Sequence, residues 1–239
     1  MRLSAGGWDT CLMAYGTAEG IGALRRERLR TARLYFVCDG RPGGEDPEPL
    51  LRAALDGGVD VIQLREKSGE SRLIDRAAPT FRRLADTYGV PFFVNDDPDL
   101  AVHCRADGVH IGQDDIPVEE ARRIIGNEAL IGLSTHSKEQ IDAAAGVDHI
   151  SVGPVWETPT KQGRPAVGLD LVTYAAKNTA LPFFAIGGID PDNVVEVLNA
   201  GARRICVVRA IRNAEDPAAV AADLRRSFAS VGGEVAPGG

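Results

Sequence analysis

The sequence predicts an α/β chain that folds as a (β/α)8 TIM barrel in a single domain. Eight short apolar runs recur between residues 33 and 211, and each is followed by a stretch whose apolar residues have helical spacing. The runs are nearly continuous in hydrophobicity, which is typical of parallel strands buried on both faces. Eight such units in about 200 residues fit a closed barrel. A doubly wound open sheet is the alternative architecture.

The expected strands lie at residues 33–39, 59–66, 91–96, 108–113, 130–135, 149–155, 182–188 and 203–211. Several of the stretches between them open with proline or a capping Asp or Ser and close with glycine, as helices do. Residues 1–30 show no strand pattern and are expected to form a partly disordered N-terminal extension. Residues 31–230 are expected to form the catalytic barrel, and residues 231–239 a disordered tail.

Charge and cysteine content narrow the class of protein. The chain has 27 basic and 34 acidic residues, a net charge of −7, which disfavours nucleic acid and anionic membranes as partners. Its four cysteines are scattered without a CxxC pair, which indicates free thiols in a reducing compartment. No apolar stretch approaches the roughly 18 residues of a membrane span. We expect a cytoplasmic protein that acts on small-molecule substrates, and a homo-oligomer is compatible with these features.

Polar residues gather where the expected strands end, which is where barrel enzymes carry their function. They are Arg65 and Lys67 after the second strand, Asn95 and Asp96 after the third, Asp115 after the fourth, Ser134 after the fifth, Gly187 and Gly188 after the seventh, and Arg209 after the eighth. Because strands of a barrel are parallel, these groups are expected to converge on one rim.

Three cations point to an anion site on this rim. Gln63, Arg65 and Lys67 continue the alternation of a strand face that should point into the barrel. Lys161 lies in the long polar loop of residues 153–168, "GPVWETPTKQGRPAVG", from which it can reach the same rim. The alternative is that Arg65 and Lys67 are solvated surface charges.

Two carboxylates are expected beside those cations. Asp96 and Asp115 follow neighbouring strands, and such a pair suits Mg²⁺, which keeps several waters and takes further ligands from a phosphate. The alternative is helix capping, by Asp115 for the helix after it and by Asp97 for the helix after "DP".

A second phosphate site is suggested after the seventh strand. Gly187 and Gly188 lie in "AIGGIDPDN", where a helix is expected to start, and the loops after strands seven and eight form the usual phosphate cradle of this fold. Tight packing explains the glycine pair equally well. His136 is the histidine nearest the rim, with acid–base catalysis and a structural role as its two interpretations. P-loop, HExxH and GxSxG motifs do not occur.

The ordered set "VIQLREK", "FFVNDD", "GVHIGQDD", "IGLSTHS", "VGPVWETPTKQGRPAVGL" and "FFAIGG" resembles the thiamine-phosphate synthase family over residues 33–225. The resemblance implies a reaction of hydroxymethylpyrimidine diphosphate with a thiazole phosphate, giving thiamine phosphate and diphosphate, with CO₂ from a carboxylated thiazole. In that family diphosphate leaves first, with Mg²⁺ assisting, and the thiazole nitrogen captures the pyrimidine-methyl cation.

The resemblance also implies residue roles. Gln63, Arg65, Lys67, Asn95, Ser134 and Lys161 would hold the pyrimidine diphosphate, with Arg65, Lys67 and Lys161 as catalytic cations. Asp96 and Asp115 would bind Mg²⁺. Thr158, Pro159, Thr160, Gly187, Gly188, Val208 and Arg209 would hold the thiazole phosphate.

The chain departs from the family pattern at Arg209, where many members have a small residue, and in residues 1–30. Two rival functions are a thiazole tautomerase on the same barrel, which does not use the diphosphate, and a non-catalytic barrel that senses a phosphorylated ligand. The complete diphosphate and metal set disfavours both.

Overall fold

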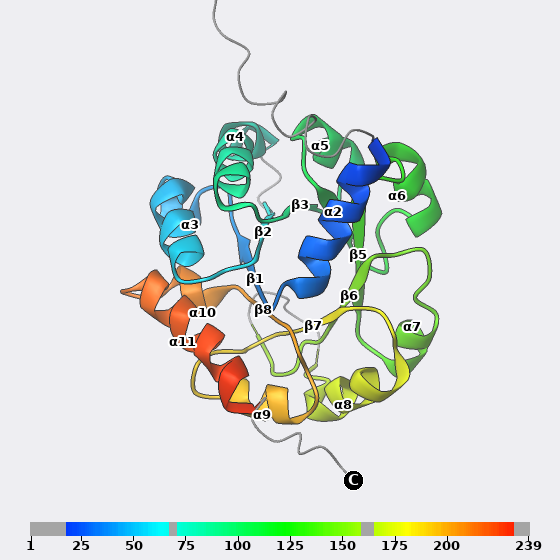
Figure 1. Ribbon diagram of the computed structural model, residues 1–239, viewed down its shortest axis with the longest axis vertical. Coiled ribbons are helices and arrows are strands. Elements are labelled where there is room, and N and C mark those ends of the chain that lie inside the picture. Colours follow the sequence, from blue (N-terminus) through cyan, green and yellow to red (C-terminus); the bar gives the residue numbers. More distant parts are fainter. Residues whose placement is uncertain (1–17, 67–70, 159–164, 232–239) are drawn as a thin grey trace, which may run out of the picture.

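The computed structural model describes residues 18–66, 71–158 and 165–231, in which eight parallel strands close into a barrel in sequence order (Figure 1). The strands are β1 (Leu34–Cys38), β2 (Val61–Leu64), β3 (Phe92–Asn95), β4 (Gly108–Ile111), β5 (Leu130–Thr135), β6 (His149–Val152), β7 (Phe183–Ile186) and β8 (Ile205–Val207). Pairing of β1 with β8, with Leu34 opposite Ile205, closes the circle. The predicted barrel is confirmed, and the open sheet is excluded.

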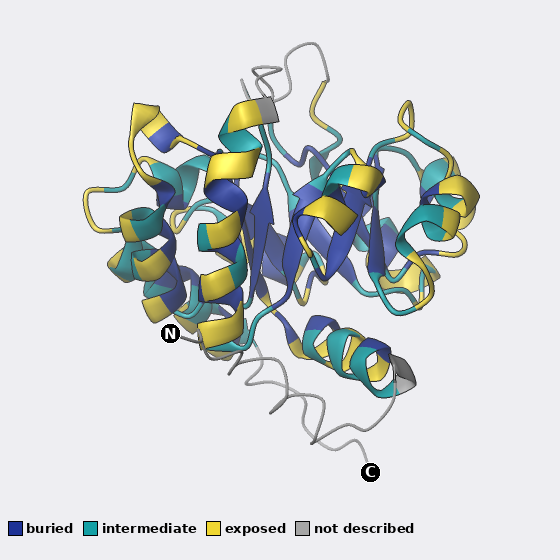
Figure 2. Cartoon of the chain, turned by 90° about the horizontal axis from the view of Figure 1, so that it is seen from above, coloured by how far each residue is buried: buried dark blue, intermediate teal, exposed yellow. Residues whose placement is uncertain are grey.

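Helices surround the barrel. They are α3 (Pro47–Asp56), α4 (Ser71–Tyr88), α5 (Pro98–His103), α6 (Val118–Ile125), α7 (Lys138–Asp142), α8 (Gly168–Asn178), α9 (Val194–Asn199), α10 (Arg209–Arg212) and α11 (Pro217–Val231), with a 3-10 turn at Pro42–Gly44. Their exposed residues face outward, whereas the strands are almost wholly buried (Figure 2). Burial of both strand faces explains the continuous apolar runs in the sequence. None of the helices within the described ranges has the length and apolarity that crossing a membrane requires.

A further helix, α2 (Ala18–Thr31), lies across the end of the barrel at which the strands begin (Figure 1). Its Leu29 is only 1% exposed and packs in the inner core with Val61, Phe93 and Leu130. This helix lies within the predicted N-terminal extension. Residues 1–17 and 232–239 are outside the described residues, so disorder at the two ends stays a prediction.

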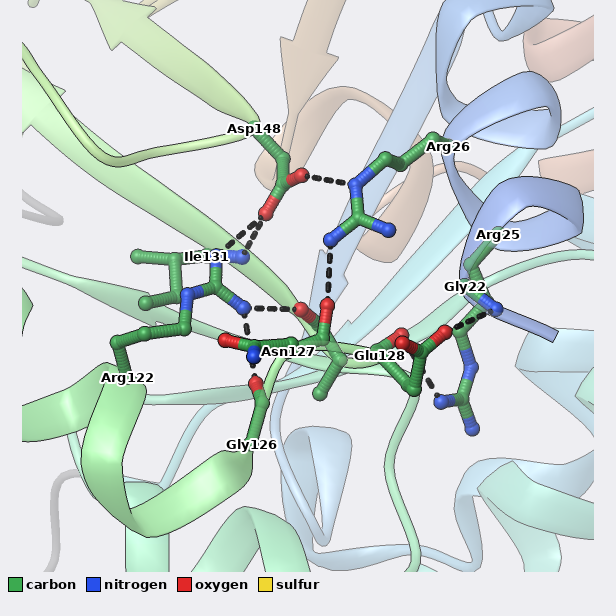
Figure 3. A network of polar contacts seen from close by, with 10 residues as sticks. Gly22, Arg25, Arg26, Arg122, Gly126, Asn127, Glu128, Ile131 and Asp148 are labelled. Carbon is green, nitrogen blue, oxygen red and sulfur yellow. Dashed lines mark hydrogen bonds and ion pairs between the residues drawn. The ribbon is translucent and has the colours of Figure 1, made fainter. Parts of the chain in front are cut away.

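Arginines of α2 attach it to the barrel (Figure 3). Arg26 Nε donates to Asp148 Oδ1 at 2.9 Å, and its Nη2 donates to the carbonyl of Asn127 at 2.6 Å. The other oxygen of Asp148 accepts from Arg122 Nη2 at 2.9 Å and from the backbone N–H of Ile131 at 2.8 Å. Arg26, in the basic run "RRERLR", therefore attaches α2 to the end of the barrel at which the strands begin.

Asp148 is one of three aspartates that each stand just before an even-numbered strand. The carboxylates of Asp60, Asp107 and Asp148 accept backbone N–H groups of Leu34, Phe92 and Ile131, respectively. Each therefore satisfies a backbone donor near the start of the preceding strand, and each also binds at least one arginine. The pattern explains a recurrent acidic residue ahead of strands that are otherwise apolar.

Seven of the eight expected strands are shorter in the structure, and those expected over 203–211 and 149–155 differ most in how they end. The run expected as a strand over 203–211 is extended only in β8, and Arg209–Arg212 forms the helical turn α10. An apolar run is compatible with either a buried strand or a buried helical turn, so hydrophobicity did not separate them. Strand β6 stops at Val152, because Pro154 follows shortly and has no N–H to extend the ladder.

Candidate active site

A cavity of about 820 Å³ opens at the C-terminal ends of the strands and extends into the barrel interior. It is lined by every predicted site residue that the structure describes, namely Gln63, Arg65, Asn95, Asp96, Asp115, Ser134, Thr158, Gly187, Gly188, Val208 and Arg209. Lys67, Pro159, Thr160 and Lys161 lie outside the described residues. The convergence on one rim follows from the parallel barrel, in which all strands end on the same side.

The end of β2 presents two donors with incomplete hydrogen bonding. Gln63 is 3% exposed and Arg65 follows it by two residues, so both side chains face the cavity. Within the described part of the chain, Gln63 Nε2 and Arg65 Nη2 are buried without a hydrogen-bond partner. Burial lowers the pKa of Arg65, while the charges of Asp96, Asp39 and Glu66 act in the opposite direction. Such donors are costly unless a ligand satisfies them, which indicates an anionic or acceptor-rich ligand here.

Asp96 and Asp115 line the cavity from the ends of β3 and β4. Asp96 adopts a left-handed backbone conformation with φ of 66°, and its N–H donates to the carbonyl of His110 at 2.8 Å. Asp115 Oδ2 accepts the backbone N–H of Gly112 at 2.6 Å. The backbone turns at both positions carry the carboxylates at the rim of the cavity.

The capping alternative is wrong for Asp115 and confirmed for Asp97. Helix α6 has Pro117 at its N-cap position and no side-chain cap bond. Asp97, in contrast, caps α5, because its Oδ1 accepts the backbone N–H of Leu100 at 2.9 Å. Asp96 and Asp97 are thus adjacent in sequence and differ in role.

The pair of carboxylates fits Mg²⁺ by its chemistry. Carboxylate oxygens are hard ligands, and Mg²⁺ is commonly held by one or two of them with waters and phosphate oxygens in the remaining positions. In residues 18–66, 71–158 and 165–231, no group of three or more His, Cys, Asp or Glu side chains is placed to hold a metal. A magnesium ion at Asp96 and Asp115 would therefore need oxygens from a phosphorylated ligand and water.

On the opposite side of the cavity, Gly187 and Gly188 have positive φ angles of 107° and 70°. A Cβ on Gly187 would lie 2.5 Å from Pro154 Cα, and one on Gly188 would lie 2.9 Å from Trp156 Cβ. The two glycines therefore pack tightly against Pro154 and Trp156 and also line the cavity. The expected helix after this pair begins only at Val194.

Val208 lies between β8 and α10, and Arg209 is the first residue of α10, a four-residue helix. Both residues line the cavity close to the loop after β7. Loops after strands seven and eight, with a short extra helix, are the recurrent phosphate site of this fold. The second phosphate site stays a prediction, made for residues that line this cavity.

His136 joins the ends of two strands. Its Nδ1 lies 2.5 Å from the carbonyl oxygen of Gly153, and its backbone N–H donates to Gln140 Oε1 at 2.7 Å. Since a carbonyl can only accept, Nδ1 carries the hydrogen of this bond. A structural role for His136 therefore explains both of these hydrogen bonds.

Sequence reasoning missed a buried polar cluster inside the barrel. It consists of His110, Ser134, His149 and Ser151, which are linked by hydrogen bonds and line the inner end of the cavity. His110 and His149 are 39 residues apart and lie on β4 and β6. Only the register of the strands brings them together, so no local signal in the sequence could have revealed the pair.

Comparison with known proteins gives consistent matches. The family model described as thiamine monophosphate synthase matches residues 34–211. A thiamine-phosphate synthase of Acidothermus cellulolyticus is 50% identical over 206 residues, which cover 84% of this chain and 97% of that protein. One of Thermus thermophilus is 52% identical over 204 residues, with coverages of 83% and 98%. The solved thiamine phosphate pyrophosphorylase of Pyrococcus furiosus superposes with a TM-score of 0.77 at 34% identity, covering 87% of this chain and 99% of that one.

Proposed function

The chain belongs to the thiamine monophosphate synthase family, and we propose that the cavity at the C-terminal ends of its strands is its active site. The protein is a transferase of thiamine biosynthesis that condenses a pyrimidine diphosphate with a thiazole phosphate. The observation that carries the assignment of the site is the pair of buried, unsatisfied donors on Gln63 and Arg65, which face the same cavity as the carboxylate of Asp96.

The pyrimidine diphosphate lies on the side of the cavity formed by β2 to β5. The residues assigned to it are Gln63, Arg65, Lys67, Asn95, Ser134 and Lys161. Arg65 is supported most directly, because its guanidinium is partly desolvated before the ligand arrives and a diphosphate oxygen would complete its hydrogen bonding. Gln63 Nε2 is equally in need of an acceptor, which a pyrimidine ring nitrogen provides.

Asp96 and Asp115 are assigned to Mg²⁺. When bound, the ion would neutralise charge on the diphosphate and orient its oxygens. The residues of this chain supply two carboxylate ligands, and the Gly112 N–H holds Asp115 in place.

The thiazole phosphate lies on the side formed by β6 to β8. The residues assigned to it are Thr158, Pro159, Thr160, Gly187, Gly188, Val208 and Arg209. Gly187 and Gly188 line the cavity with backbone groups, which can bind a phosphate, and Arg209 adds a positive charge to the same cavity.

Catalysis follows from where charge develops. As the bond between the pyrimidine methylene carbon and the diphosphate breaks, negative charge grows on the leaving diphosphate, and the thiazole nitrogen then bonds to the methylene carbon. Cations held ready in a desolvated site stabilise that charge without having to reorganise. Arg65, Lys67 and Lys161 are assigned this role. With a carboxylated thiazole, CO₂ leaves as well.

A coupling assay tests the proposal. Pyrimidine diphosphate and thiazole phosphate are incubated with the protein, with and without a chelator, and diphosphate and thiamine phosphate are measured together. We expect equal amounts of both products and their loss on chelation. A folded protein that binds thiazole phosphate but forms neither product would instead favour the tautomerase or the sensor.

A further inference from the structure

A chain of hydrogen bonds leads from the barrel interior to the cavity. His149 Nε2 lies 3.3 Å from His110 Nδ1, and His110 Nε2 lies 3.0 Å from Ser134 Oγ. Ser151 Oγ lies 3.4 Å from both His110 Nε2 and Ser134 Oγ, so its contacts are weaker. Ser134 is the member of this chain that is assigned to the pyrimidine substrate above.

The contact between the two imidazoles depends on Gly132. In the register of the strands, His110 of β4 and His149 of β6 both lie opposite Gly132 of β5. A Cβ at position 132 would clash with His110 Nδ1 and with the ring of His149. The two rings therefore meet over a strand position that only glycine can occupy.

His149 is enclosed by aromatic rings and is neutral at physiological pH. It has 0% exposure, with Phe93 and Phe184 edge-on at centroid distances of 5.2 and 5.5 Å and Tyr35 at 6.0 Å. Burial lowers the pKa of His149 to about 4, while the charge of Asp148 raises it and that of Arg204 lowers it further. A neutral imidazole has one N–H and one lone pair, so each nitrogen has a single role.

The surroundings decide which nitrogen of His149 carries the hydrogen. Nδ1 is buried and has no hydrogen-bond partner in the described part of the chain. A hydrogen there would leave a buried donor unsatisfied, whereas an orphaned acceptor is the more tolerated state. The hydrogen therefore belongs on Nε2, from which it is donated to His110 Nδ1. His110, accepting at Nδ1, then carries its own hydrogen on Nε2 and donates it to Ser134 Oγ.

We propose that His149 is a positioning residue that holds His110 as the Nε2–H tautomer, so that Ser134 accepts from His110 and points its own hydroxyl hydrogen into the cavity. There the hydroxyl donates to a ring nitrogen of the aminopyrimidine of the diphosphate substrate. In the opposite tautomer, Ser134 would donate to His110 and present only lone pairs to the ligand. The identity of the acceptor rests on the proposed function, whereas the tautomer of His110 does not.

The tautomers are measured first, without substrate. Two-bond ¹H–¹⁵N correlation spectra of the labelled wild-type protein distinguish the protonated ring nitrogen of each neutral histidine, and the His110→Gln and His149→Gln spectra assign the signals. We expect the hydrogen on Nε2 in both rings. A hydrogen on Nδ1 of His110 would overturn the proposal, whatever the enzyme does.

Kinetics of two His149 variants then test the link to the substrate. His149→Leu removes the donor, whereas His149→Gln keeps an amide N–H near the position of Nε2. We expect His149→Leu to raise KM for the pyrimidine diphosphate about tenfold, the effect of one neutral hydrogen bond, and to leave KM for the thiazole phosphate unchanged. His149→Gln should restore KM to within about threefold of wild type.

Outcomes of the kinetic test separate the two hypotheses. Equal increases of KM for both substrates, or equal effects of Leu and Gln, would mean that His149 is only a packing residue and would refute the positioning role. Absence of coupling by the wild-type protein would refute the proposed function and leave the tautomer measurement standing. If the His149→Leu variant does not fold, the wild-type spectra still test the tautomer, and the His149→Gln variant still tests the link to the substrate.

Discussion

Arg26 of α2 and Asp148, which precedes β6, are 122 residues apart and form an ion pair of 2.9 Å at the end of the barrel opposite the cavity. The side chain of Asp148 is only 11% exposed and also binds Arg122 and the N–H of Ile131. The ion pair therefore attaches α2 to the barrel whose strands carry the candidate site. Helix α2 precedes residues 34–211, which match the family model.

Asp148→Ala should destabilise the protein much more than Arg26→Ala. The aspartate change leaves the N–H of Ile131 and Nη2 of Arg122 without this acceptor, at a cost of about 2–4 kcal/mol in the free energy of unfolding. The side chain of Arg26 is 43% exposed, so the Arg26→Ala change should lower the free energy of unfolding by only about 0.5–1 kcal/mol. Urea unfolding measures both.

Arg30→Ala is the matched control for this first prediction. Arg30 lies on the same helix, and within the residues that the structure describes its side chain pairs only with the exposed Glu27, so its replacement should change the free energy of unfolding by less than about 0.5 kcal/mol. If Arg26→Ala and Arg30→Ala were indistinguishable, and Asp148→Ala no worse than either, α2 would not be fastened in this way.

Arg65→Ala and Arg209→Ala should affect different substrates. Arg65 is assigned to the diphosphate, so its loss should lower kcat about 10²–10³-fold, because the stabilised charge appears as diphosphate departs. Arg209 is assigned to the thiazole phosphate, so its loss should raise KM for thiazole phosphate about tenfold with a smaller effect on kcat. Steady-state kinetics with each substrate varied in turn measures both, and the reverse pattern would exchange the two assignments.

Asp96→Asn should raise the Mg²⁺ concentration needed for half-maximal activity by about tenfold or more, because an amide oxygen is a weaker ligand than a carboxylate. Titration of activity with Mg²⁺ measures the shift. Asp97→Asn is the control, since it is the same chemical change one residue away and an asparagine still caps α5. Superimposable titrations of the two variants would remove Asp96 from the metal site.

His149 should make stability depend on pH between about 4 and 6.5. Burial lowers the pKa of His149 in the folded protein to about 4, below the ordinary histidine value of 6.5, so the unfolded chain binds the proton more readily over this range. The contribution of His149 is therefore complete above about pH 6.5 and is lost as the pH falls toward 4, at about 1 kcal/mol per pH unit.

The measurement is urea unfolding at several pH values for the wild type and for His149→Gln, which cannot titrate. Other groups titrate in both proteins, so the difference between their slopes isolates His149. The wild type should lose stability more steeply below pH 6.5. Parallel curves would show that His149 accepts a proton in the folded state as easily as in the unfolded chain.

Much of the candidate site was within reach of the sequence, because each residue is tied to the end of a strand. Arg65 follows β2 and Asp96 follows β3, and once the strands are parallel and closed, their ends meet on one rim. The capping and metal interpretations of Asp115 could not be separated in the same way, since capping requires only that the helix begin two residues earlier than it does. The end of β8 was also beyond reach, because an apolar run is the same in a strand and in a buried helical turn.

The sequence by itself determined the strand order, the barrel and the residues at its rim, since hydrophobic runs and their flanking polar groups are local features that a parallel topology maps directly into space. Only the tertiary structure decided that α2 closes the far end of the barrel and that His110 meets His149 above Gly132. The contact of the histidines depends on the register between strands, and the position of α2 depends on an ion pair between residues 122 positions apart. Neither leaves a periodic pattern in the sequence.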